Sequence, residues 1–198
     1  RSNTARSLSV TNNITINANA SFDIRISSNV THTLFTQGNI INNGKLDFAV
    51  DNNSFCRAVF LKNGNQTVTG TGTLTRFKNI QVNLGTSITN TVEITASNFA
   101  ASSGFLIINN GTFKLSTTNA LSAACFSVAA TIPSTGRLFL NSSVAVLTAS
   151  ANVTLNGNIT VAAGTLNIGD AANEDLISSG GTLTQSGGII NITGKYNT

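Results

Sequence analysis

Short segments in which apolar and polar residues alternate follow glycine at several places in this chain. Three of them share the order glycine, polar, apolar, polar, apolar: residues 44–48 (GKLDF), 111–115 (GTFKL) and 164–168 (GTLNI). Residues 136–140 (GRLFL) are a near match, with Phe139 at a polar position. Because alternate side chains of a strand point to opposite faces of a sheet, each segment predicts a glycine turn followed by a half-buried β-strand.

The two faces of these segments differ in chemistry. Charged and amide side chains occupy one set of alternate positions, and apolar side chains occupy the other set. One face of each strand is therefore predicted to lie in the core and the other to face solvent. The predicted core residues are Leu46, Phe48, Phe113, Leu115, Leu138, Leu140, Leu166 and Ile168. The residues predicted to face solvent are Asp47, Lys114, Arg137 and Asn167.

The glycines that open these segments recur at intervals that fit the turns of a solenoid. They are separated by 67, 25 and 28 residues, and a coil of about 20 to 30 residues is typical of a β-solenoid. The first interval then holds two or three coils, with residues 69–83 (TGTGTLTRFKNIQVN) as an intermediate strand segment. We predict an all-β chain that forms one right-handed parallel β-helix over residues 1–198. A β-sandwich, which also has short strands and frequent turns, is the structural alternative.

Two features of the middle of the chain refine this prediction. Residues 119–130 (NALSAACFSVAA) are rich in alanine and fit either a short helix or a buried strand, and the alternation of Phe126 and Val128 favours the strand.

The two cysteines, Cys56 and Cys125, are 69 residues apart, which is two to three coils. Stacked coils at about 4.8 Å would hold their Cα atoms too far apart for a disulfide, so we expect two buried, unpaired thiols.

Composition supports a β-rich chain with a neutral polar surface. Charged residues make up 9% of the sequence, whereas asparagine and threonine each occur 28 times and glycine 17 times. The net charge is +4, but the basic residues are scattered rather than clustered with aromatic residues, which argues against a nucleic-acid partner. No window of 18 apolar residues exists, so no transmembrane segment is expected. Residues 1–13 lack the apolar stretch of a signal peptide, so we expect a processed chain or a fragment.

Two longer stretches resemble a known group of bacterial proteins. Residues 65–87 (NQTVTGTGTLTRFKNIQVNLGTS) and 164–196 (GTLNIGDAANEDLISSGGTLTQSGGIINITGKY) are similar to the adhesin-like parallel β-helical regions of large surface or secreted proteins that the type IX secretion system exports. The resemblance covers somewhat over a quarter of the chain. It implies a secreted or outer-membrane-associated location, contact with the type IX machinery during export, and surface glycans or other cell-surface proteins as partners. Because that group usually ends in a C-terminal sorting domain, which these residues do not resemble, we expect the chain to be a fragment or a processed piece.

The acidic residues offer little for catalysis or for metal binding. If one strand held both Asp47 and Asp51, their Cα atoms would be about 13 Å apart, too far for the carboxylate pair of a glycosidase. The densest acidic segment is residues 169–175 (GDAANED), in which Asp170, Glu174 and Asp175 are candidate Ca²⁺ ligands. Their spacing does not match an EF-hand, so we expect a solvated corner loop. The other acidic residues are Asp23 and Glu93.

The remaining candidate sites also lead to a structural interpretation. His32 is the lone histidine and is expected at an outward strand position, with no triad partner. Tryptophan is absent and Tyr196 is the lone tyrosine, so the rings on which sugars usually stack are missing, and the 11 phenylalanines suit the core. We therefore expect a non-catalytic, structural or adhesin-like module without cofactor. The alternatives are a polysaccharide lyase or hydrolase, and an ice-binding solenoid suggested by residues 67–75 (TVTGTGTLT).

Overall fold

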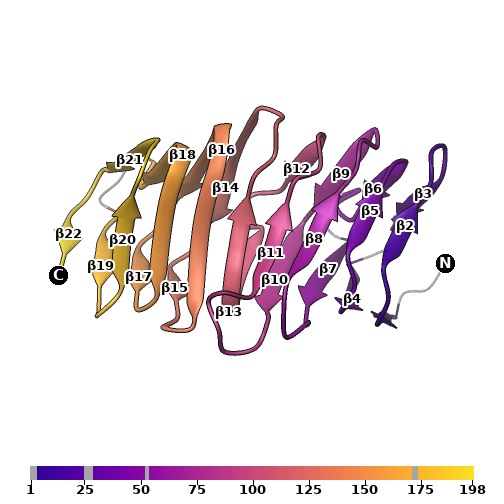
Figure 1. Cartoon of the computed structure of the whole chain (residues 1–198), viewed down its shortest axis with the longest axis horizontal. Helices are drawn as coiled ribbons and strands as arrows, with labels where there is room; N and C mark the ends of the chain where they lie inside the picture. The colour runs from indigo at the N-terminus through magenta and orange to yellow at the C-terminus, as the bar shows by residue number, and fades with distance from the viewer. Residues whose placement is uncertain (1–3, 25–28, 52–53, 171–173) are drawn as a thin grey trace.

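The computed structural model describes residues 4–24, 29–51, 54–170 and 174–198. In these ranges the chain forms 22 strands and no helix, and the paired strands run parallel. The strands stack as a β-solenoid of about 8 turns, which confirms the predicted parallel β-helix. The sandwich alternative is wrong, because its sheets would consist of antiparallel pairs. Figure 1 shows the coils side by side along the long axis, with the two termini at opposite ends.

Each coil has three sides, which we call faces A, B and C in the order in which the chain meets them. Face A consists of β1 (Ser7–Val10), β4 (Thr31–Thr36), β7 (Phe55–Phe60), β10 (Asn79–Asn83), the first half of β13 (Leu106–Leu115), β15 (Ala130–Ile132), β17 (Val153–Leu155), β19 (Leu176–Ser178) and β22 (Tyr196–Asn197). Face B consists of β2 (Ile14–Ile16), β5 (Ile40–Asn42), β8 (Gln66–Thr69), β11 (Thr91–Ile94), the second half of β13, the first halves of β16 (Gly136–Ala149) and β18 (Asn158–Ile168), and β20 (Thr182–Gln185). Face C consists of β3 (Ser21–Asp23), β6 (Lys45–Asp47), β9 (Leu74–Phe77), β12 (Phe99–Ala101), β14 (Leu121–Phe126), the second halves of β16 and β18, and β21 (Ile189–Ile192).

The coil length is close to the predicted one, but the glycine-led segments are not all equivalent. Partner residues on adjacent coils are between 19 and 29 positions apart in the sequence. Gly111 pairs with Gly136 on face B, as their 25-residue interval predicts. Gly44 and Gly164, in contrast, precede strand segments of face C. The interval of 28 residues between Gly136 and Gly164 therefore crosses a corner and does not measure a coil.

Gly164 makes the corner between faces B and C in β18. Where β16 uses the four residues 142–145 to turn this corner, β18 uses Gly164 alone. Its φ angle is 83°, and a Cβ atom at this position would lie 2.3 Å from the carbonyl oxygen of Ser142. Because a side chain would both strain the backbone and clash with the neighbouring coil, the sharp corner requires glycine.

A row of phenylalanine rings stacks through the interior of the first five coils. Consecutive ring centroids are 5.1 to 6.2 Å apart, and most pairs meet edge to face. Such pairs add to the stability that burial of their area provides. The members of this row, which we call the phenylalanine ladder, are Phe22, Phe48, Phe77, Phe99, Phe105 and Phe113.

The expected sorting of side chains is confirmed for the core and fails at one outward position. All eight predicted core residues are at most 1% exposed. Lys114, Arg137 and Asn167 are partly exposed on the outward side of their strands. Asp47 is the exception, since it is 2% exposed. Neighbouring charged side chains cover it, an arrangement that strand alternation alone does not predict.

Asparagine side chains continue the hydrogen bonding between coils at a corner of the solenoid. The backbone amide of Asn39 donates to Oδ1 of Asn13 at 2.9 Å, and the amide of Thr67 donates to Oδ1 of Asn39 at 2.9 Å. One coil further on, the amide of Thr91 donates to Oδ1 of Asn65 at 3.0 Å. Where the backbone turns away from its ladder, an amide side chain supplies the missing acceptor, which accounts for part of the high asparagine content.

The strand ladders are interrupted in the middle of the stack. In the described chain β12 does not pair with β14 on face C, and β13 does not pair with β15 on face A. Asn119 bridges the first gap: its Oδ1 accepts from the amide of Phe99 at 3.1 Å and its Nδ2 donates to the carbonyl of Phe99 at 2.9 Å. The segment 119–130 contains strand β14, as predicted, but Val128 is 72% exposed because the strand ends at Phe126.

Candidate functional site

The most buried charged group of the described chain belongs to an ion pair on face C. Arg76 on β9 donates two hydrogen bonds to Asp47 on β6, from Nε to Oδ1 at 2.8 Å and from Nη2 to Oδ2 at 2.7 Å. Lys45 Nζ lies 3.5 Å from Oδ2 of the same carboxylate. Burial alone would raise the pKa of Asp47, but the hydrogen bonds from Arg76 and from the Ala49 amide bring it below its ordinary value. Asp47 therefore stays ionised and joins two coils.

The structure pairs Asp47 with a different carboxylate from the one considered from the sequence. Asp51 lies beyond the end of β6, whereas Asp23 on β3 is in register with Asp47 on the adjacent coil. Two neighbouring carboxylates are the minimum for a retaining glycosidase. Here the Asp47 side chain is 3% exposed and bound by Arg76 on both oxygens, so it cannot contact a sugar. Asp23 accepts a hydrogen bond from Ser21 Oγ at 2.6 Å.

The candidate calcium ligands lie in a corner between coils. Part of their segment, residues 171–173, lies outside the described residues. Glu174 Oε2 accepts from the amide of Asp170 at 3.3 Å. Asp175 accepts from the Lys195 amide at 2.7 Å and from Asn197 Nδ2 at 3.2 Å. Among the residues that the structure describes, no group of three or more metal-binding side chains is found.

The two cysteines are buried and unpaired, as expected. Cys56 lies on β7 of face A and Cys125 on β14 of face C, and both are free thiols. Burial raises the pKa of each thiol to about 12. A thiol with this pKa is a poor nucleophile at neutral pH, so neither is a candidate for covalent catalysis.

His32 does not take the outward position expected from the sequence. It is in register with the inward Cys56 and shares the strand side of the buried Leu34. Its Nδ1 accepts a hydrogen bond from the backbone amide of Arg6 at 3.1 Å. The histidine is therefore half-buried at the start of the stack and holds two coils together.

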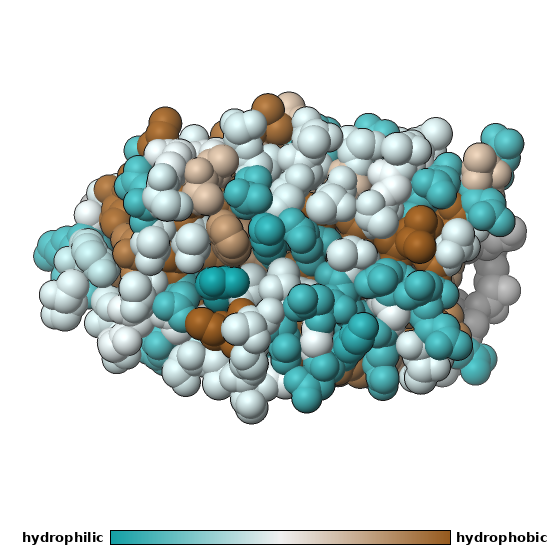
Figure 2. Space-filling view, in the orientation of Figure 1, coloured by the Kyte–Doolittle hydropathy of each residue, from teal (hydrophilic) through white to brown (hydrophobic). Residues whose placement is uncertain are grey.

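Face B carries an outward row in which charged and aromatic side chains contact each other across coils. Register places Glu93, Lys114 and Phe139 side by side on β11, β13 and β16. Glu93 Oε1 lies 2.9 Å from Lys114 Nζ, and Lys114 Nζ lies 5.3 Å from the centre of the Phe139 ring. Figure 2 shows hydrophilic side chains gathered over these strands in the middle of the visible face.

Arg137 completes this group from the same strand as Phe139. Its guanidinium carbon lies 5.1 Å from the centre of the Phe139 ring, and its Nε donates to Thr112 Oγ1 at 3.0 Å. Burial lowers the pKa of Arg137. In the described chain Glu93 is engaged by Lys114 and Ser116, and no ion pair includes Arg137.

Next to Arg137 and Phe139 the following coil presents small polar side chains. Arg137 is in register with Asn158 and Phe139 with Thr160, both on β18. We call these four side chains the Arg137 patch. It joins a cation, an aromatic ring, an amide and a hydroxyl on the outward side of one sheet. Because the pair on β18 lies 21 positions beyond the pair on β16, only the register of adjacent coils brings the two pairs together.

An apolar groove on face A marks the gap between β13 and β15. It has a volume of about 310 Å³ and is lined by residues 106–109, 126–131 and Gly104. Ile107 and Val128 are exposed at its rim, at 37% and 72%. Its depth comes from the missing strand pairing, which a sequence pattern does not indicate.

The threonines of residues 67–75 do not form a continuous array. Thr67 stands in the outward row of face B that continues with Glu93, Lys114 and Phe139 before it reaches Thr160 and Thr184. An ice-binding surface needs regularly repeated hydroxyls on successive coils. Three side chains of other kinds interrupt this row.

Comparison with known protein families, with curated proteins and with solved structures finds no match for this chain. Across the described residues there is also no helix with the length and apolar character that a membrane crossing requires. The fold and the geometry of its surfaces are therefore the basis for assigning a function.

Proposed function

We propose that this chain is a non-catalytic, adhesin-like module of a secreted or cell-surface protein, which holds flat binding faces on a stiff stack of coils. The resemblance of residues 65–87 and 164–196 to regions exported by the type IX secretion system supports the location and the secretion route. The observation that carries the proposal is the separation of side chains into apolar inward rows and mainly polar outward rows along about 8 turns.

The interior provides the stiffness that such a module needs. Each coil buries its inward side chains on its neighbours, so the stack has a continuous core over its whole length of about 40 Å. The phenylalanine ladder and the corner asparagines link successive coils in addition to the backbone. A stiff body of this kind presents its outward side chains at fixed spacings.

Three of the seven carboxylates are engaged in the fold, which argues against a catalytic role for them. Asp47 is held by Arg76, Glu93 by Lys114 and Ser116, and Asp175 by the coil that follows it. A glycan-cleaving enzyme needs at least one carboxyl group that contacts the scissile bond. These three side chains already accept hydrogen bonds that hold the coils together.

The proposal is tested by incubating the immobilised chain with a panel of acidic and neutral polysaccharides. Retained polysaccharide and newly formed reducing or unsaturated ends are measured together over time. We expect retention of at least one glycan class without any growth of product. Product that accumulates with time, and that is lost on replacing one carboxylate, would make the chain a lyase or hydrolase and would refute the proposal. Retention of no glycan would refute the binding role.

A further inference from the structure

From the geometry of the Arg137 patch we infer that face B binds the carboxylate of an acidic sugar, with Arg137 as the anion ligand and Phe139 as the surface on which the sugar ring packs. This inference rests on the proposed adhesin-like function and names the ligand class of one of its faces. It follows from three features of the patch: an unneutralised guanidinium, its fixed orientation, and the groups around it.

Arg137 carries the positive charge that its surroundings do not balance. The nearby carboxylate of Glu93 is bound by Lys114 Nζ at 2.9 Å and by Ser116 Oγ at 2.8 Å. Hydrogen bonds from both keep the pKa of Glu93 below its ordinary value, although burial acts in the opposite direction. Lys114 and Glu93 therefore neutralise each other, and the guanidinium of Arg137 is left as the excess charge of the patch.

The orientation of the guanidinium is fixed before any ligand arrives. Its Nε is held by Thr112 on the preceding coil, and its guanidinium carbon lies over the Phe139 ring, 5.1 Å from the ring centre. The described structure shows hydrogen bonding through Nε, which leaves the two terminal nitrogens for a ligand. Two parallel N–H groups match the two oxygens of a carboxylate, and holding them in place beforehand lowers the entropic cost of binding.

The neighbouring groups favour a sugar over other anions. Phe139 offers a partly exposed ring against which the apolar side of a pyranose packs. Asn158 and Thr160 on the next strand offer an amide and a hydroxyl for sugar hydroxyls. A nucleic acid would need a row of cations along the same face, but the outward residues that follow on β20 are Thr182 and Thr184.

The test is a calorimetric titration with α-1,4-linked trigalacturonate, with maltotriose as the matched neutral trisaccharide. We expect the chain to bind the acidic trisaccharide and not the neutral one. Arg137→Gln should weaken binding by about tenfold or more, because a charge-assisted pair of hydrogen bonds is lost. Arg137→Lys should weaken it nearly as much, since the charge remains but the fork is lost. Phe139→Leu should weaken it by a smaller factor.

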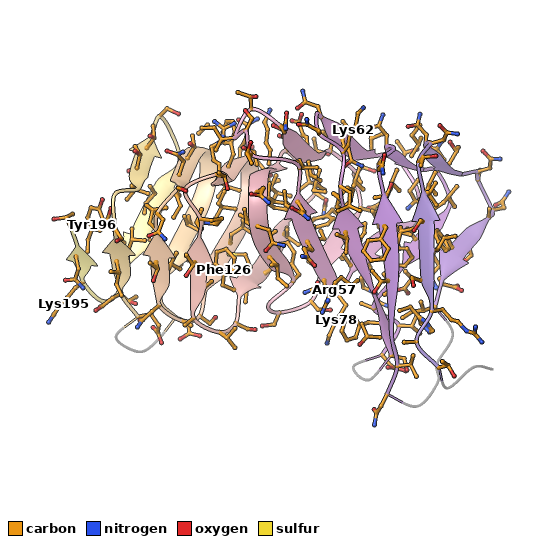
Figure 3. The ribbon with its side chains drawn as sticks, turned by 90° about the horizontal axis from the view of Figure 1, so that it is seen from below. Arg57, Lys62, Lys78, Phe126, Lys195 and Tyr196 are labelled. Atoms are coloured by element: carbon orange, nitrogen blue, oxygen red, sulfur yellow. The ribbon has the colours of Figure 1, made fainter. Side chains whose placement is uncertain are left out.

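Arg57 supplies the matched control. It is also a half-buried arginine that donates from Nε to the neighbouring coil, at 3.1 Å to Asn79 Oδ1, but it lies on face A. Figure 3 shows it near Lys78 on that side of the molecule. Arg57→Gln should leave the affinity unchanged, and thermal melts of all variants confirm that they are folded.

Several results would overturn the inference. These are equal binding of maltotriose, equal binding of a hexaglutamate peptide, complete displacement by acetate at the same carboxylate concentration, or an equal loss of affinity in Arg57→Gln and Arg137→Gln. If the polysaccharide panel shows retention that Arg137→Gln does not alter, the Arg137 patch fails as a site while the adhesin-like function stands. If the panel shows cleavage, the proposed function itself fails.

Discussion

At the scale of single residues, the buried carboxylate of Asp47 and the two buried thiols have the clearest consequences for stability and reactivity. Strand alternation assigned Asp47 to solvent, and the structure buries it under Arg76 and Lys45. Alternation gives the side of the sheet on which a residue lies, but it does not give the size of the neighbours on adjacent coils. The partner Arg76 is 29 residues away, and only the register of the coils identifies it.

Removing the partner of this buried carboxylate should destabilise the fold. Arg76→Gln leaves Asp47 without its two charge-assisted hydrogen bonds, so we expect the free energy of unfolding to fall by about 2 kcal/mol. Urea unfolding at pH 7 measures this change. Arg57→Gln, an arginine of similar burial that contacts no carboxylate in the described structure, should cost much less. Equal losses in both variants would contradict a specific role for the ion pair.

The same pair predicts a dependence of stability on pH. The folded-state pKa of Asp47 lies below its ordinary value of 3.8, so its carboxylate stabilises the fold above that pH. This stabilisation is lost as the pH falls through the lower folded-state pKa. The difference in unfolding free energy between the natural chain and Asp47→Asn should therefore be constant near neutral pH and shrink below about pH 4. A difference that grows on acidification would show the opposite sign of linkage.

The two thiols should be unreactive in the folded chain. Burial and a pKa of about 12 for Cys56 and Cys125 leave almost no thiolate at pH 8. An aromatic disulfide reagent should thus modify neither cysteine until denaturant is added, after which both should react within minutes. Rapid modification of one thiol in the native chain would show that its coil opens locally.

At the scale of elements, the sequence predicts strands and coil length well and corners poorly. Alternation correctly identified the core side of strands β6, β13, β16 and β18, because a period of two depends only on local geometry. The interval between Gly136 and Gly164 was interpreted as one coil, which was wrong, because Gly136 begins a segment of face B and Gly164 a segment of face C. The Arg137 patch was also missed, because its residues come from two coils and the sequence does not give their register.

The phenylalanine ladder should dominate the stability of the first five coils. Phe77 is fully buried between Phe48 and Phe99, with ring centroids 5.7 and 6.2 Å away. Phe77→Ala would open a cavity that the neighbouring coils cannot close, so we expect a loss of about 3 to 5 kcal/mol. Val128→Ala, at a position 72% exposed, is the control and should change stability by less than about 0.5 kcal/mol. Chemical denaturation of both variants measures the two changes. A loss for Phe77→Ala no larger than that for Val128→Ala would contradict the stabilising role of the ladder.

At the scale of the whole molecule, a solenoid is a one-dimensional stack in which each coil contacts only its neighbours. The termini lie at opposite ends of the stack (Figure 1), so a force applied between them acts along the direction of the hydrogen bonds between coils. Because the coils are loaded in series, every contact between coils carries the same force, and the contact that resists least opens first. The interruptions between β12 and β14 and between β13 and β15 remove the strand pairing of one face from two successive contacts between coils in the middle of the stack.

Stretching the chain between its ends in optical tweezers should therefore extend it in steps. One coil of about 24 residues contributes about 80 Å of extended chain, so steps of this size or small multiples of it are expected. The Phe77→Ala variant should lower the force of the steps that release the first five coils and leave the others unchanged, because the ladder ends at Phe113. A single extension of the whole chain in the natural protein would mean that the coils unfold as one cooperative unit. In that case the stack would transmit load from end to end, and the gaps in its ladders would have no mechanical consequence.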